Sequence, residues 1–129
     1  RGSKFSEQFG SWKTFYMSYL LGRSLVALRS EDILKLAVSL EGGEIIPKGS
    51  KLKVLAINDA AVPALHAMAL EPGLFAQLEL YNSRSSWIEM LKESQPKRCF
   101  EDIVHGALQA YDLPDLERLC RKKLFSEKK

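Results

Sequence analysis

The stretch that most constrains the fold is Val54–Pro72, which reads VLAINDAAVPALHAMALEP. It begins as an apolar run typical of a buried parallel strand. It then turns at Asn58 and Asp59 and continues into an alanine-rich segment with almost no polar face. A helix that is apolar on every side must be covered on every side. The stretch therefore predicts a strand, a sharp turn and a buried helix that packs against a sheet.

The flanking sequence extends this stretch into a βαβ unit. LKVLAI at residues 52–57 is the first predicted strand, and GLFAQLELYN at residues 73–82, which follows the breaker Pro72, is the second. Two strands joined by a helix in this way are parallel. Two strands make a thin sheet for an α/β domain, so we expect residues 1–129 to form a single domain that is a segment of a larger one.

Helices are predicted on both sides of this unit. The aromatic residues Trp12, Phe15, Tyr16 and Tyr19 follow helical spacing and predict a packed helix over residues 11–21. A second helix is predicted from a cap at Ser30 to a stop at Gly42 or Gly43. Helix and loop segments are predicted at residues 85–94, 99–111 and 112–125, the last with Asp112 as cap and Pro114 in its first turn.

Composition excludes several classes of function. The net charge of +3 comes largely from the tail at residues 118–129, which is predicted to be a solvated end rather than a nucleic-acid interface. No apolar run reaches the roughly 18 residues of a membrane helix. Cys99 and Cys120 fit no zinc or redox spacing and are expected to be reduced. We find no nucleotide or metal motif, so we expect no cofactor, metal, membrane or nucleic-acid partner.

Four stretches, taken together, resemble one known family. They are YLLGRSLVALRSEDIL, AINDAAVPALHAMALEP, FAQLELYNSRSSW and IVHGALQAYDLPDLERL. In this order they resemble segments of the acetyl xylan esterase and related esterase-like branch of the α/β-hydrolases, over Tyr19–Leu119. The resemblance implies a partial α/β-hydrolase-like three-layer arrangement. It would have a short parallel sheet, a buried helix after the nucleophile-equivalent turn and several C-terminal helices.

The resemblance places the family's G-x-S-x-G motif on residues 56–60. The nucleophile-equivalent position is then Asn58, and the oxyanion-equivalent position is Asp59. A neutral Asn cannot be activated by a His to attack an ester as a Ser can. A carboxylate at residue 59 that faced the pocket would oppose a developing oxyanion. We therefore expect no catalytic residue, and we expect Asn58 or Asp59 to cap the following helix.

The remaining candidate groups receive structural interpretations. His66 and His105 do not match the position of the family's catalytic His, and Glu79 on the second strand is an acid without a nucleophile or base. The carboxylates Asp112, Asp115 and Glu117 are expected to cap and solvate the last helix.

The expected function is a degenerate acetyl xylan esterase-like domain or fragment that is not catalytic. One alternative is a part of an active carbohydrate-ester hydrolase whose catalytic groups are supplied elsewhere. Another is a non-enzymatic binding or interaction module that uses the crevice at the strand ends. Bare strand edges predict self-association, a marginally stable monomer, or docking with the remainder of a larger hydrolase domain. A small-molecule ester or carbohydrate is implied only by the resemblance.

Overall fold

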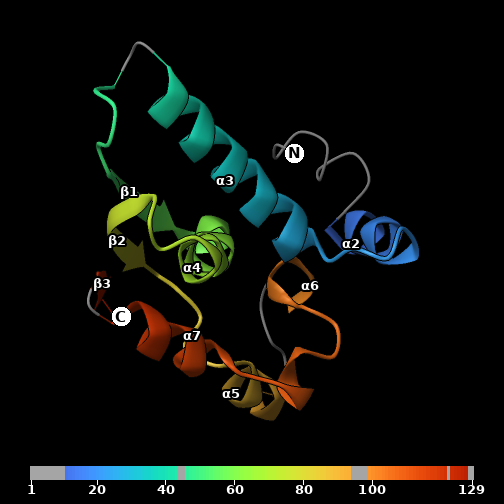
Figure 1. Cartoon of the computed structure of the whole chain (residues 1–129). Coiled ribbons are helices and arrows are strands. Elements are labelled where there is room, and N and C mark those ends of the chain that lie inside the picture. Colours follow the sequence, from blue (N-terminus) through green and yellow to red (C-terminus); the bar gives the residue numbers. More distant parts are fainter. Residues whose placement is uncertain (1–10, 44–45, 94–98, 122, 128–129) are drawn as a thin grey trace.

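The computed structural model describes residues 11–43, 46–93, 99–121 and 123–127, which form a mixed α/β arrangement (Figure 1). In chain order the elements are α2 (Ser11–Leu20), α3 (Leu25–Gly42), β1 (Leu52–Ile57), the 3₁₀ turn η1 (Asn58–Ala60), α4 (Ala61–Leu70), β2 (Phe75–Tyr81), α5 (Trp87–Lys92), α6 (Cys99–Asp102), the 3₁₀ turn η2 (Ala107–Gln109), α7 (Leu113–Cys120) and β3 (Leu124–Glu127).

The sheet has the order β1-β2-β3, and both pairs of strands are parallel. Ala56 of β1 lies beside Leu80 of β2, and Leu78 of β2 lies beside Leu124 of β3. The predicted βαβ unit is therefore confirmed in its two strands, its intervening helix and its parallel direction.

The prediction for the C-terminal segment is wrong. α7 ends at Cys120, and residues 124–127 form a strand where a continued helix and a solvated end were predicted. Three long-range hydrogen bonds made by Lys123 hold this segment. The backbone N–H of Leu78 donates to the carbonyl of Lys123 at 2.8 Å, and the Lys123 ammonium donates to the carbonyls of Pro72 and Phe75 at 2.6 and 2.9 Å. A strand this short is fixed by its partner strand rather than by its own propensity.

The alanine-rich helix α4 lies at the centre of the core, as its sequence predicts. Seven of its ten residues are buried, and their small side chains let it approach its neighbours closely. α3 and α7 flank α4, and the sheet covers another of its sides (Figure 1). The neighbouring elements contribute Ala37, Ala56, Phe75, Leu78, Leu80, Leu116 and Cys120 to the same buried cluster.

The opposite face of the sheet is open at β1. Leu55 and Ile57 are 59% and 52% exposed, and no helix in the described ranges covers them. Parallel sheets are usually covered on both faces.

The second helix begins earlier than predicted. α3 starts at Leu25, and Ser24 is its N-cap, because the Ser24 hydroxyl accepts from the Ala27 N–H at 3.0 Å. Ser30, the predicted cap, is instead buried inside α3. Its hydroxyl lies 2.8 Å from the carbonyl of Val26 and 2.9 Å from the carbonyl of Pro63 in α4. Ser30 therefore joins two helices instead of starting one, a role that depends on the packing of α4.

We predict that Ser30→Ala lowers the free energy of unfolding by about 1 kcal/mol, because it removes the buried bond to the Pro63 carbonyl. Ser39→Ala is a matched control, since Ser39 makes a similar bond to Lys35 on an exposed part of α3. Urea unfolding of both variants and the parent chain measures the difference. Equal effects of the two substitutions would contradict the role assigned to Ser30.

The open face of β1 predicts self-association of the isolated chain. Sedimentation velocity should show dimers or larger species that diminish in Leu55→Lys, which places a charge on this face beside Glu79. Leu36→Lys, at an exposed position of α3, is the control and should sediment like the parent chain. A parent chain that is a tight monomer at every concentration would refute this prediction.

Candidate functional site

The turn after β1 has the sharp geometry that the sequence predicts. Ile57 is extended, with φ −124° and ψ 136°, and Asn58 then takes a left-handed φ of 55°. Asn tolerates this conformation better than most residues because its short polar side chain can hydrogen-bond locally. The chain passes through η1 directly into α4, so Asn58 lies at the bend between strand and helix.

The prediction that Asn58 or Asp59 caps α4 is wrong. The N-cap of α4 is Ala60, and no side chain makes a cap hydrogen bond there or at the start of η1. The Asn58 amide oxygen instead accepts from the Asn82 amide nitrogen at 2.5 Å. Asn82 follows β2 and is also left-handed, with φ 50°. Because β1 and β2 are parallel, their two terminal turns meet at one edge of the sheet, and the amide pair joins them.

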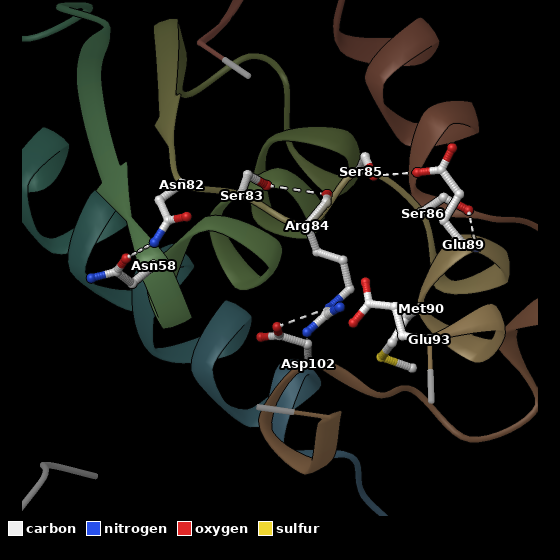
Figure 2. Close-up of a pocket in the computed structure, with 10 residues that line it drawn as sticks. All are labelled: Asn58, Asn82, Ser83, Arg84, Ser85, Ser86, Glu89, Met90, Glu93 and Asp102. Carbon is white, nitrogen blue, oxygen red and sulfur yellow. Dashed lines mark hydrogen bonds and ion pairs between the residues drawn. The ribbon is translucent and has the colours of Figure 1, made fainter. Parts of the chain in front are cut away.

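A cavity of about 590 Å³ opens at this edge (Figure 2). Its volume is within the usual range for small-molecule sites. Its walls come from the turn after β1, the loop after β2, and helices α5 and α6, and they are mainly polar. The lining residues are Asn58, Asn82, Ser83, Arg84, Ser85, Ser86, Glu89, Met90, Glu93 and Asp102.

A buried ion pair forms one wall of the cavity. Figure 2 shows Arg84 extending from the loop after β2 toward Asp102 on α6, where its Nε lies 3.3 Å from Oδ2. The two side chains are only 14% and 9% exposed. Burial raises the pKa of Asp102, and Arg84 opposes this shift. The Trp87 indole N–H donates to the carbonyl of Asp102 at 2.8 Å and fixes the position of α6.

A pair of carboxyl groups, Asp59 and Glu101, lies beside the turn. Burial raises the pKa of Glu101, and the charge of Asp59 and a hydrogen bond with it add to the rise, while Arg29 opposes it. Arg29 also makes a long contact of 3.5 Å to the Asp59 carbonyl. Asp59, the predicted oxyanion-equivalent residue, therefore lies between the carboxyl group of Glu101 and the guanidinium group of Arg29.

Both ring nitrogens of His66 make hydrogen bonds inside the protein. Its Nδ1 lies 2.8 Å from the Val62 carbonyl, which can only accept, so Nδ1 carries the proton. Its Nε2 then accepts from the Tyr111 hydroxyl at 2.9 Å. Burial lowers the pKa of His66. The ring centroids of His105 and Tyr19 are 5.0 Å apart. Neither His66 nor His105 lines the cavity beside Asn58.

Asp112, the predicted cap of the last helix, is the N-cap of α7. Asp112 and Asp115 form a capping box at the start of α7. Asp112 also accepts from the Trp87 N–H at 2.8 Å and from the Ser86 hydroxyl, a role in α5 that its local sequence did not predict. Glu79 accepts from the side chains of its strand neighbours Gln77 and Tyr81 and does not line the cavity.

The aromatic residues of α2 pack only in part. Phe15 contacts the rings of Tyr16 and Tyr19, but these two tyrosines remain 50% and 46% exposed. The side chain of Trp12 lies outside the described part of the chain, as does that of Cys99. Cys120 is a free buried thiol, and burial raises its pKa.

The described ranges contain neither a metal-binding cluster nor a membrane-spanning helix. No group of three or more His, Cys, Asp or Glu residues there could hold a metal ion. No described helix is long and apolar enough to cross a membrane. Comparison of the whole chain with protein-family models, curated proteins and solved structures found no match.

The environment of His66 predicts a loss of stability in acid. The unfolded chain binds a proton at His66 near the ordinary pKa of 6.5, whereas the folded chain binds it only at lower pH. The stabilisation from neutral His66 is therefore complete above about pH 6.5 and falls as the pH decreases through the lowered pKa of the folded state. Denaturant midpoints at pH 8 and pH 5 should differ less in His66→Gln than in the parent chain. His105→Gln should keep the parent difference, and an unchanged difference in His66→Gln would contradict the assignment.

Proposed function

We propose that this chain is part of an α/β-hydrolase-like domain, similar to the acetyl xylan esterase-like branch, whose nucleophile turn no longer carries a catalytic group. The supporting observation is the left-handed φ of 55° at Asn58, directly between β1 and α4. The family's nucleophile occupies a strained strand-to-helix turn of this kind. The parallel order β1-β2-β3 and the buried helix after the turn are consistent with the same origin.

The chemistry of the turn supports a non-catalytic role. The Asn58 amide has no proton that a base could remove at neutral pH, and its oxygen is engaged by Asn82. His66 uses both ring nitrogens in the core. The nucleophile and base of an esterase are therefore missing from the described part of the crevice.

The alternative of an active hydrolase would need a different nucleophile. Ser85 and Ser86 line the cavity, and their hydroxyls donate to the carboxylates of Glu89 and Asp112. A serine bonded to a carboxylate without a histidine between them lacks the usual activating base. This alternative therefore requires a catalytic base from another part of the protein.

We predict that the purified chain hydrolyses p-nitrophenyl acetate no faster than buffer and that Asn58→Ser gives no gain. The substitution should also lower the free energy of unfolding by about 1 kcal/mol, since Ser is less favourable than Asn at this φ. Asn58→Gly is the control, because it removes the same amide while accepting the backbone conformation. A rate increase of several orders of magnitude in Asn58→Ser would show a working base nearby and refute the proposal.

One specific observation favours the alternative hypothesis that this chain is a binding module. The crevice at the carboxyl ends of the strands is a formed cavity with mainly polar walls. Open α/β sheets bind ligands at this edge. A chain that has lost ester-hydrolysing activity can therefore keep a ligand-binding site at the carboxyl ends of its strands.

A further inference from the structure

A second cavity lies between the helices of the core. Helix α4 packs against both α3 and α7 (Figure 1). The three helices line a groove of about 590 Å³, a volume within the usual range for small-molecule sites. This helical groove shares no lining residue with the cavity beside Asn58. A ligand bound in it would therefore be independent of the turn after β1.

The walls of the helical groove are mainly aliphatic. More than half of its lining residues are Ala, Val or Leu, and they include Leu34 of α3, Ala69 and Leu70 of α4, and Leu116 and Leu119 of α7. Leu70 and Leu119 are 66% and 76% exposed. A ligand that covered them would remove apolar surface from water, which is favourable. The walls are therefore suited to an alkyl chain.

Three polar side chains in the wall already use their protons. The Ser30 hydroxyl faces two backbone carbonyls, at 2.8 and 2.9 Å. His66 donates from Nδ1 to the Val62 carbonyl, and the Tyr111 hydroxyl donates to His66 Nε2. Burial lowers the pKa of His66 and raises the pKa of Tyr111, so both groups are neutral at neutral pH. These side chains offer no unused donor, so an acceptor group on a ligand must bind elsewhere in the groove.

Unused donors lie at the end of the groove that is formed by the start of α3. Arg23 and Ser24 line the groove there. The Ser24 hydroxyl accepts from the Ala27 N–H, and a hydroxyl that accepts keeps its own O–H as a donor. Arg23 pairs with Glu31 through one terminal nitrogen, whereas a guanidinium group has five N–H donors. This end of the groove can therefore bind an acceptor group.

Positive charge predominates at the same end. Arg23 and Glu31 line the groove, and Glu31 also pairs with Lys35 at 2.8 Å. One carboxylate is thus shared by two cations, whose side chains are 50% and 68% exposed. Lys35 can continue to neutralise Glu31 when Arg23 binds a ligand. The excess positive charge favours an anionic head group over a neutral or cationic one.

We propose that the helical groove binds an aliphatic monocarboxylate, with its alkyl chain against Leu70 and Leu119 and its carboxylate at Arg23 and Ser24. The planar fork of an arginine matches the geometry of a carboxylate. An alkylammonium head would be repelled by Arg23, and a neutral alcohol would gain nothing from its charge. The site goes beyond the proposed function, which concerns the strand ends.

Isothermal titration calorimetry with octanoate tests the proposal. 1-Octanol and octylammonium have the same chain length, and acetate has the head group without the chain. Octanoate should bind about fivefold more tightly than 1-octanol, as expected for an exposed ion pair, and acetate should show no binding. Absence of octanoate binding at millimolar concentration would overturn the proposal. Binding of 1-octanol or octylammonium as tight as that of octanoate would overturn it as well.

Two substitutions locate the head group and the chain. Arg23→Gln should weaken octanoate binding by about fivefold and leave 1-octanol binding unchanged. Arg118→Gln is the matched control, because Arg118 is also an exposed member of an ion pair but lies outside the lining. Ala69→Phe fills the groove and should abolish the binding of both ligands. Ala110→Phe, at an exposed position outside the lining, should bind like the parent chain.

These results can be separated from those for the proposed function. If Ala69→Phe does not fold, Arg23→Gln and the comparison of octanoate with 1-octanol still decide the question. Unchanged octanoate binding in Arg23→Gln, or in a folded Ala69→Phe, would place the carboxylate elsewhere and refute the proposal. Esterase activity would refute the non-catalytic role of the turn without affecting the calorimetric result.

Discussion

The burial of α4 is the constraint on which the rest of the structure depends. Its ten residues include seven buried ones, so the sheet, α3 and α7 must all pack against it. This packing makes Ser30 a buried bridge to the carbonyl of Pro63 and joins His66 to Tyr111. It also fixes the direction in which the chain leaves β1, so that Asn58 bends toward the carboxyl edge of the sheet.

A single carboxylate organises the other side of the crevice. Asp112 accepts from the backbone N–H groups of Trp87 and Leu113, so it holds the first turns of both α5 and α7. Burial alone would raise the pKa of Asp112, but the bonds from Ser86, Trp87 and Leu113 outweigh it and keep the pKa below its ordinary value. Trp87 in turn holds the carbonyl of Asp102. The wall of the cavity is therefore connected to the start of α7 through two side chains.

The polar groups at the strand ends are paired mainly with one another. Asn58 and Asn82 engage each other, and Arg84 engages Asp102. Asp59 and Glu101 lie close enough that the charge of Asp59 helps to raise the pKa of Glu101.

The local sequence determined those elements whose own residues form a recognisable secondary-structure pattern. The strands of the βαβ unit, the buried helix and the cap at Asp112 follow from apolar runs, small residues and an Asp before a Pro-containing first turn. Only the tertiary structure decided the role of Ser30, the strand at residues 124–127 and the pairing of Asn58 with Asn82. Each depends on a partner that is distant in the sequence, so a local pattern contains no information about it. The carboxylates around the cavity are of the same kind, because Asp59 of η1, Glu89 of α5 and Asp102 of α6 meet only when the chain folds.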